Sequence, residues 1–367
     1  YYKVIGDKQK LVSGSMNQYH NFIKRKLIKM ACDDRKNLSL LDLGCGKMGD
    51  FFKCALNNVG FLMGVEYDYN NLFGSPDSFP APVRILQNID RSPKIKNIAN
   101  NTVIIWGDVT KNIASGDSAR DELNKYYLDV LYGRTPSHNI HKLSRLRDKV
   151  KQKFDVVSCQ FTMHYFFGDA ETLEGFMVNI YENLKDGGMF IGTCLDGKSV
   201  FKALKKGTKD SDKHRFIEGG KTNENDVVWR ITENYPYKAK LHDDETSLGF
   251  EIKVLFETFT RETSEYLVNF DYFKELMNNY GLEIIDSKLF GEEPGSYLEE
   301  FKKECIRKQA SKHDKNFYEE FIKNKDMVKY SNLHRWFIFK KKDSSDYMLS
   351  DSETEEDSIL EPAVDNA

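Results

Sequence analysis

The fold is decided by the stretch Leu41-Asp42-Leu43-Gly44-Cys45-Gly46-Lys47-Met48-Gly49-Asp50, which overlaps a short apolar run at 39–43. Its three glycines have the spacing G-x-G-x-x-G, and glycines in such a turn let the backbone bend sharply and approach a ligand closely. A second apolar run ends in Glu66, where a carboxylate can accept both hydroxyls of a ribose. The stretch therefore predicts a strand, a glycine-rich turn that contacts a ribose-bearing ligand, and a helix.

Apolar runs and helical stretches alternate along the first half of the chain. After a basic amphipathic helix at 19–36, buried strands are predicted at 39–43, 60–66, 103–106, 154–161 and 189–193, with a helix at 170–184 and a turn at 186–188. This order implies right-handed crossovers and a mostly parallel sheet, which is an α/β fold. The second half predicts antiparallel strands at 227–232 and 250–259, then a helix at 270–280 and closing strands at 282–290 and 335–341.

Charge is distributed unevenly along the chain. The 54 Lys and Arg face 57 Asp and Glu, but nine of the acids lie in 343–367, which leaves the body with 48 acids and a net charge of +6. A basic body fits a polyanionic partner. We expect one domain over 1–342, with a basic helical insert at 111–153, and an acidic disordered tail at 343–367. The end of the insert, 141–153, has six basic residues and one acid, so it is either an RNA-facing patch or a solvated helix face.

Several classes of protein are excluded by the composition. The sequence has no apolar run long enough to span a membrane, and residues 1–10 contain no apolar signal core. The six cysteines form no C-x-x-C pair and have no zinc-ligand spacing. We therefore expect reduced thiols, no metal and no membrane association.

The acids around the glycine turn favour a methyl donor over a dinucleotide. Asp42 precedes the first glycine and Asp50 closes the turn, while Asp108 follows the third strand and could accept from an adenine amino group. Gln160 and Phe161 end the fourth strand, where they can flank the same ligand. An acid-lined pocket suits the sulfonium of S-adenosylmethionine and repels a pyrophosphate. A nicotinamide dehydrogenase and a purely structural turn remain as alternatives.

A second motif follows the fourth strand, Phe161-Thr162-Met163-His164-Tyr165-Phe166-Phe167. Ligands of α/β folds bind beyond the carboxyl ends of the strands, which is where this cluster falls. A histidine packed among core aromatics explains the same residues equally well on chemistry alone.

Together these motifs resemble the eukaryotic-type mRNA cap (guanine-N7) methyltransferases. The resemblance also rests on Asn21-Phe22-Ile23-Lys24, Ser158-Cys159-Gln160, Gly187-Gly188-Met189-Phe190-Ile191-Gly192 and Glu265-Tyr266-Leu267-Val268. It implies a Rossmann-like class I S-adenosylmethionine-dependent methyltransferase fold, with a mostly parallel sheet, an antiparallel last strand and an inserted antiparallel β element. The segment 123–133 is similar to the version in large nucleocytoplasmic DNA viruses.

The resemblance, together with the chemistry of the glycine turn and the strand ends, assigns roles to individual residues. Residues expected to bind the methyl donor are Lys24, Asp42, Gly44, Gly46, Asp50, Glu66, Asp108, Gln160, Phe161 and Tyr165. Residues expected at the cap are Asn21, Lys47, His164, Glu265 and His334. Glu265 can accept from guanine N1–H and the exocyclic amine together, and Phe161 and Tyr165 can offer apolar faces to a base. His164, Tyr165 and Glu265 would position the substrate, and no residue would transfer a proton.

Three positions depart from the family pattern. Met48 stands where many members have Gly, Glu66 where Asp is usual, and His334 is the nearest match to a cap-contacting Tyr. Glu66 can keep the role of Asp with one more methylene. The departure at His334 leaves one wall of the cap pocket undetermined by the sequence.

The expected activity is transfer of a methyl group from S-adenosylmethionine to N7 of the terminal guanosine of GpppRNA. The alternatives are a catalytically inactive scaffold or stimulatory subunit, and a small-molecule methyltransferase. Because the chain begins with Tyr1, we expect upstream triphosphatase and guanylyltransferase modules; the need for a stimulatory subunit stays open. The expected location is the host cytoplasm (viral factory) or virion for a viral protein, and otherwise intracellular.

Overall fold

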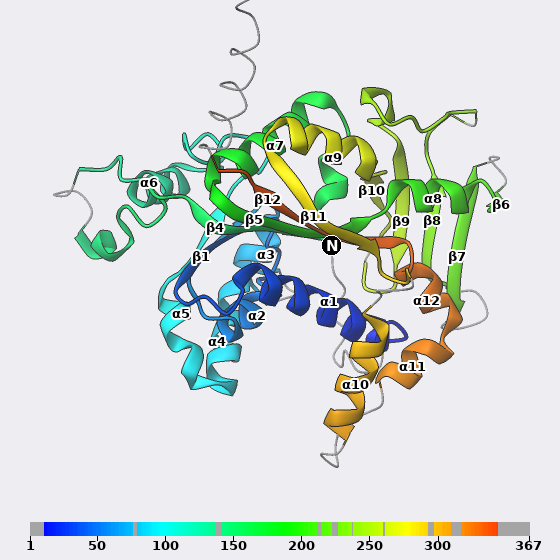
Figure 1. The fold of residues 1–367 in the computed structure, drawn as a ribbon, viewed down its shortest axis with the longest axis horizontal. Helices are drawn as coiled ribbons and strands as arrows, with labels where there is room; N and C mark the ends of the chain where they lie inside the picture. Colours follow the sequence, from blue (N-terminus) through cyan, green and yellow to red (C-terminus); the bar gives the residue numbers. More distant parts are fainter. Residues whose placement is uncertain are drawn as a thin grey trace, which may run out of the picture.

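A seven-stranded sheet forms the centre of the computed structural model (Figure 1). The structure describes residues 11–343 except 76–78, 137–140, 211–213, 222–226, 237, 260, 293–296 and 310–316. The strands of this sheet are β1 Leu38–Leu43, β2 Val59–Glu66, β3 Thr102–Trp106, β4 Phe154–Gln160, β5 Leu184–Leu195, β11 Leu282–Leu289 and β12 His334–Lys341. The predicted acidic tail, apart from Asp343, lies outside the described residues.

The strand order is β11-β12-β5-β4-β1-β2-β3. Neighbours from β5 to β3 pair in parallel, whereas β12 is antiparallel to both β5 and β11. The chain reverses its direction of travel across the sheet between β1 and β4, and such a reversal opens a crevice at the carboxyl ends of the strands. The predicted fold, with its mostly parallel sheet and antiparallel last strand, is confirmed.

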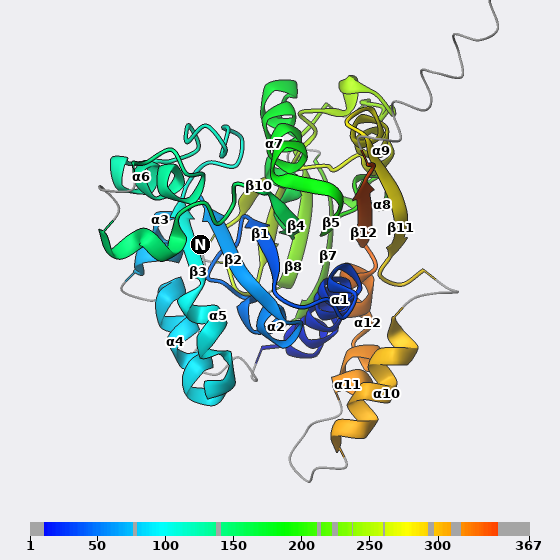
Figure 2. The same cartoon turned by 60° about the vertical axis from the view of Figure 1, so that its left-hand side comes forward.

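Helices cover both faces of this sheet (Figures 1 and 2). One face carries α1 Gly14–Cys32, α2 Phe51–Leu56, α4 Ala81–Arg91 and α5 Lys96–Asn100; the other carries α7 Ala170–Asn183 and α9 Phe270–Asn279. Successive strand residues point to opposite faces. In β12, Trp336 and Ile338 accordingly pack in the core that contains α1, while Phe337 and Phe339 pack in the core that contains α7 and α9.

A second, antiparallel sheet has the order β10-β9-β8-β7-β6. Its strands are β6 Thr208–Lys209, β7 Arg215–Lys221, β8 Val227–Glu233, β9 Glu251–Phe256 and β10 Thr263–Tyr266. A bridge between Asp196, just after β5, and Val268, just after β10, ties the two sheets together. The inserted antiparallel element is therefore confirmed, and it also contains β6, β7 and β10, which were not predicted.

The remaining elements are shorter or peripheral. They are α3 Tyr69–Phe73, α6 Glu122–Leu131, α8 Gly197–Leu204, α10 Leu298–Gln309, α11 Phe317–Lys323, α12 Lys325–Ser331, and the 3-10 turns η2 Pro93–Ile95, η4 His141–Leu146, η5 Met163–Tyr165 and η6 Glu245–Ser247. The predicted insert at 111–153 thus contains α6 and η4. It leads into the amino end of β4, at the sheet edge opposite the crevice.

The largest differences from the predicted boundaries are at the first helix, at β5 and at the end of β9, which is Glu251–Phe256 and not 250–259. The first helix is Gly14–Cys32 and not 19–36. The turn predicted at 186–188 lies inside β5, where the pairing with β4 shifts register after Phe154 and resumes at Val156 with Met189. Gly187, with φ of 70°, allows the extra residues to bulge out without ending the strand.

Candidate active site

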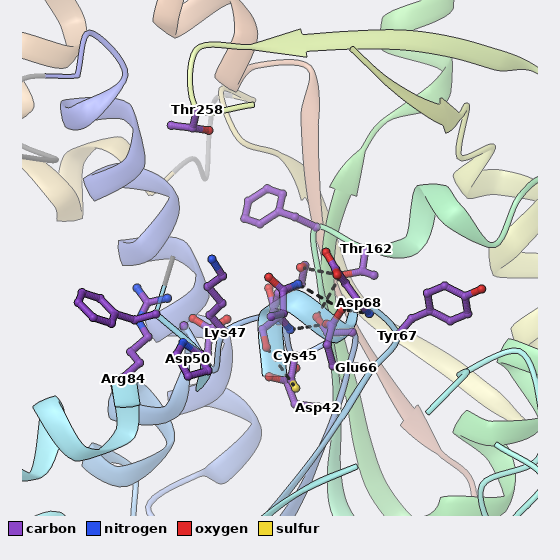
Figure 3. Close-up of a pocket in the computed structure, with 18 of the residues that line it drawn as sticks. Asp42, Cys45, Lys47, Asp50, Glu66, Tyr67, Asp68, Arg84, Thr162 and Thr258 are labelled. Carbon is purple, nitrogen blue, oxygen red and sulfur yellow. Dashed lines mark hydrogen bonds between the residues drawn. The ribbon is translucent and has the colours of Figure 1, made fainter. Parts of the chain in front are cut away.

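A cavity of about 2030 Å³ opens at the carboxyl ends of β1, β2, β3 and β4 (Figure 3). Its walls include α1, α4 and the turn between β9 and β10. Most of the predicted site residues line it, namely Asn21, Lys24, Asp42, Gly44, Gly46, Lys47, Asp50, Glu66, Asp108, Gln160, Phe161 and Tyr165. Three predicted residues do not: His164, Glu265 and His334.

The glycine turn leaves room for a ligand. Gly44 has φ of 73°, and a Cβ there would overlap the side chain of Thr162. Gly46 has φ of 54°, and a Cβ there would meet no atom within 4 Å, so its backbone borders open space. Met48 also has a left-handed φ, of 55°, which explains why glycine suits that position. Its buried side chain packs beneath the turn and does not narrow the cavity.

Glu66 is fixed by the turn that it faces. Its Oε2 accepts from the Gly46 N–H at 2.7 Å, while Oε1 accepts from the Asp68 N–H at 2.8 Å and from Asn71 Nδ2 at 3.2 Å. Burial raises the pKa of the Glu66 carboxyl, and these hydrogen bonds oppose that shift. A carboxylate has about four acceptor positions. One therefore remains for a ribose hydroxyl, and a second becomes available if the bond to Gly46 opens.

Two acids on either side of the turn differ in charge state. Burial raises the pKa of Asp42 to about 7, and the nearby Asp50 carboxylate adds to the shift. Burial acts on Asp50 in the same direction, but Lys24 and Lys53 hold its pKa well below the usual range. Their Nζ atoms lie 2.9 and 2.6 Å from Asp50 Oδ1. Lys24, expected to bind the donor, thus neutralises Asp50, and Asp42 is the acid free to respond to a bound cation.

The carboxyl end of β4 contributes a polar side chain, Gln160, and next to it an aromatic one, Phe161. Gln160 accepts from Thr193 Oγ1 at 3.0 Å and donates to Ser158 Oγ at 3.2 Å, which orients its amide. Phe161 has φ of 56° and stacks on His20 at 5.3 Å between ring centroids. Such backbone strain is tolerated where the surroundings determine the conformation.

Asp108 occupies the position predicted for an adenine contact. Its Oδ1 accepts from the Thr110 N–H at 2.9 Å and from Thr110 Oγ1 at 2.7 Å. Among the described residues Oδ2 has no partner, so one carboxylate oxygen is available in the cavity wall. This agrees with an acceptor for an exocyclic amine.

His164 and Glu265 form a buried pair behind the cavity wall. His164 Nδ1 lies 3.7 Å from Glu265 Oε2, and the two residues are 7% and 4% exposed. Burial raises the pKa of Glu265 to about 8 and lowers that of His164 to about 3. Within the described chain, His164 Nε2 has no hydrogen-bond partner, and Glu265 accepts only from Thr263 Oγ1, at 3.3 Å. Tyr165, which lines the cavity, packs against His164 at 4.2 Å between ring centroids.

His334 lies in an aromatic cluster and not in the cavity wall. Its Nδ1 contacts the Tyr330 carbonyl at 3.0 Å, and its ring meets Phe161 edge-on at 5.4 Å. His20 belongs to the same cluster, with Nε2 at 2.9 Å from Ser331 Oγ. Burial lowers the pKa of His334 to about 4 and that of His20 well below its usual value. In this structure both histidines support Phe161 from behind.

Arg84 on α4 was not predicted as a site residue. It lines the cavity beside Lys47, and Figure 3 shows the two side chains on the same side of the glycine turn. Burial lowers the pKa of Lys47, and the charge of Arg84 lowers it further. Figure 3 also shows Thr258, from the turn after β9, across the cavity. Arg84 and Thr258 reach the cavity through tertiary packing, so no local sequence motif indicates them.

Among the described residues, no cluster of His, Cys, Asp and Glu could hold a metal ion. Nor does any helix of the described chain combine the length and the apolar character that crossing a membrane would need.

The sheet order and the acid-lined glycine turn at its crevice define a class I methyltransferase fold. The family model of the mRNA (guanine-N(7))-methyltransferase domain matches residues 91–359, and the chain belongs to that family. The family predicted from the motifs is therefore confirmed.

Named relatives come from a virus, a plant and a yeast. The chain is 27% identical over 301 residues to a probable mRNA-capping enzyme of Acanthamoeba polyphaga mimivirus, a match that covers 79% of this chain and 23% of that protein. It is 25% identical over 270 residues to mRNA cap guanine-N(7) methyltransferase 1 of Arabidopsis thaliana, covering 74% and 59%. The corresponding enzyme of Saccharomyces cerevisiae is 24% identical over 291 residues, covering 78% and 56%. The matches thus span under a quarter of the viral relative and little more than half of the others.

Proposed function

We propose that this domain transfers a methyl group from S-adenosylmethionine to N7 of the terminal guanosine of GpppRNA. The observation that carries the proposal is the buried pair beside the cavity, because His164 Nε2 and the Glu265 carboxyl have unused hydrogen-bonding capacity. Buried polar groups are rarely left without partners in proteins. A pair of this kind next to a ligand cavity is therefore best explained as a site for a polar ligand.

The donor end fits S-adenosylmethionine. When bound, the donor supplies an electrophilic methyl group on a positively charged sulfur. Glu66 offers acceptors at the end of β2, and Asp42 lies buried beneath the turn with a raised pKa. A cation that binds near Asp42 favours its ionised form, so donor binding and loss of the Asp42 proton support each other.

The base end fits guanine and not adenine. A Glu265 carboxylate can accept from N1–H and the exocyclic amine of guanine, whereas adenine has no N1–H. His164 Nε2, which has no partner in the described chain, can hydrogen-bond to a polar group of the base. Neither residue lines the cavity, so we expect Tyr165, which is 46% exposed, to turn aside when a base binds.

The residues of the chain contribute to the proposed reaction by orienting the two reactants. Guanine N7 has a lone pair and no proton to lose, so its attack needs no general base. Correct orientation of two reactants can contribute several kcal/mol to the barrier. The low pKa of His164 leaves the ring neutral at physiological pH, which agrees with a positioning role.

The whole protein is proposed to be larger than this domain. Its viral relative is named a capping enzyme and is several times longer than the matched region. We infer that the domain is the methyltransferase module of such an enzyme, acts on capped RNA made by triphosphatase and guanylyltransferase modules, and works in the viral factory of the host cytoplasm or in the virion. An inactive scaffold is disfavoured because the donor-end residues are all present in the cavity.

The test is incubation with labelled S-adenosylmethionine and either GpppA or ApppA, followed by digestion and mapping of the methylated base. We expect label at N7 of guanine from GpppA and none from ApppA. The matched control is Glu265→Gln, which keeps the shape of the side chain and loses the carboxylate. Equal labelling of the two dinucleotides, or label at another position, would exclude the proposed function.

A further inference from the structure

A polar stripe of α4 faces the outer part of the cavity. The cavity-lining residues of this helix are Arg84, Gln87, Asn88 and Arg91. Their spacing of three, four and seven residues places them on one side of an α-helix. Ala81 and Ile85, which lie beside this stripe on the helix, are buried and hold α4 against the core.

A second polar stripe lies on α1. Besides Lys24, its cavity-lining residues are Gly14, Asn17, Gln18 and Asn21, again three, four and seven residues apart. Figure 3 shows the helices on the side of the cavity that carries Lys47 and Arg84. The cavity is therefore bordered by two helix faces with hydrogen-bonding groups, beyond the donor end at the strands.

The cavity is larger than a site for one small molecule. Small-molecule sites usually measure about 300–1,000 Å³, whereas this cavity measures about 2030 Å³. From Arg84 to Arg91 the helix rises about 10 Å. A trough of this length and polarity suits an extended polar ligand that continues outward from the cap.

Charge and aromatic side chains point to single-stranded nucleic acid. Arg91 is exposed and makes no ion pair within the described part of the chain, and Gln87 is exposed without a hydrogen bond there. Phe73 and Phe79, which precede α4, line the same cavity and are 52% and 71% exposed. Cationic grooves combined with exposed aromatic rings are the usual means of binding single strands.

We infer that the α4 stripe binds the first transcribed nucleotides of the RNA, downstream of the triphosphate bridge. Arg91 contacts a backbone phosphate, Gln87 hydrogen-bonds to a sugar or base edge, and Phe79 stacks on a base. The inference rests on the proposed function, because it assigns the outer part of the same cavity to the remainder of the same substrate.

The experiment compares two substrates in one assay. Steady-state methylation is measured with the dinucleotide GpppA and with a capped single-stranded RNA of about ten nucleotides, for the parent, Arg91→Gln, Gln87→Ala and Lys36→Gln. Lys36 is the matched control, since it is an exposed cation before β1, at the opposite edge of the sheet from the cavity.

For Arg91→Gln and Gln87→Ala we expect KM for the capped RNA to rise about three- to tenfold, with kcat and the kinetics on GpppA unchanged. For Arg91→Gln, the slope of log kcat/KM against log salt should also fall by about 0.7, as expected for the loss of one single-strand phosphate contact. Lys36→Gln should match the parent in every measurement.

Three results would overturn the inference. They are an equal loss on GpppA and on RNA, no loss on either, and a parent enzyme for which RNA is no better than the dinucleotide. The first would limit α4 to the cap, and the second would agree with a face that binds a protein subunit. If the parent methylates neither substrate, the proposed function fails by itself. In that case RNA affinity, measured by the anisotropy of a fluorescent 5′-triphosphate RNA, still tests the inference. Arg91→Gln must weaken RNA binding, and Lys36→Gln must leave it unchanged.

Discussion

Cap affinity should increase with pH because Glu265 must lose a proton to accept from guanine. Burial raises the pKa of this carboxyl to about 8, and its only described hydrogen bond comes from Thr263. A protonated carboxyl cannot accept from N1–H and the amine with both oxygens. Guanine binding is thus coupled to release of the proton, and the affinity reflects the fraction of molecules that are ionised.

The expected size follows from the titration. With a pKa of about 8, about 3% of the carboxyl is ionised at about pH 6.5 and about 75% at about pH 8.5, since each pH unit corresponds to about 1.4 kcal/mol. Apparent affinity is reduced by the fraction in the competent state. The Kd for the cap should therefore fall roughly 25-fold across this range. The pKa of His164, lowered to about 3, keeps that ring neutral throughout.

The measurement is calorimetric titration of GpppA into protein saturated with S-adenosylhomocysteine, at several pH values from about 6.5 to 8.5. The single-turnover rate at saturating donor and cap should stay flat over the same range, because no group loses a proton in the chemical step. Glu265→Gln should bind weakly at every pH. A Kd of the parent that does not change with pH would refute the coupling, and a rate that rises through a limb lost in His164→Asn would refute the mechanism without a base.

Three further outcomes are expected. Glu66→Ala should weaken S-adenosylmethionine binding at least tenfold by calorimetry, because each charge-assisted bond contributes about 1.5–3 kcal/mol; unchanged affinity would contradict the assignment of the β2 end. Glu265→Gln should raise the unfolding free energy, measured in denaturant, by a few kcal/mol at about pH 9 and by much less near pH 5. The reason is that the pKa of Glu265 is higher in the folded than in the unfolded state, so the parent loses stability as pH rises to about 8. A pH-independent difference would contradict the raised pKa. Met48→Gly should lower stability by about 1–3 kcal/mol in the same assay, since loss of a buried side chain outweighs relief of the left-handed φ; a stabilised variant would show that strain dominates.

The sequence was sufficient to bring the residues predicted to bind the donor to one cavity, because the signals there are local. Buried parallel strands are short apolar runs, so the predicted bounds of β1, β2 and β4 agree with the structure to within a residue. The glycine turn follows β1 directly, and Glu66 ends β2, so both must meet at the carboxyl edge of the sheet. The structure adds that Glu66 and Gly46 are hydrogen-bonded to each other.

The base end and the outer part of the cavity depend on contacts between distant segments. Short antiparallel strands such as β10 contain too few residues for a pattern, and their register is set by the partner strand. His334 was assigned to the cap wall by its nearness to a family position, but it shares a face of β12 with Trp336 and Ile338, both of which are core residues. The alternation along that strand could have indicated its burial. The α4 stripe has helical spacing, but only the fold shows which side faces the cavity.

The two acids with raised pKa values limit the charge that is buried at the site. Asp42 at the donor end and Glu265 at the base end have pKa values of about 7 and about 8, both raised chiefly by burial. Each is largely or partly neutral at about pH 7, which limits the cost of desolvating two carboxylates. Ligand binding is expected to favour the ionised form of each acid: the positive charge of the donor favours it for Asp42, and the N–H groups of guanine favour it for Glu265. In the proposed reaction, methyl transfer moves positive charge from the donor to the guanine, that is, from the side of Asp42 toward the side of Glu265. An ionised Glu265 would interact more favourably with the guanine as the base becomes positive. The group that we propose to select the base would then also stabilise the transition state more than the bound substrate.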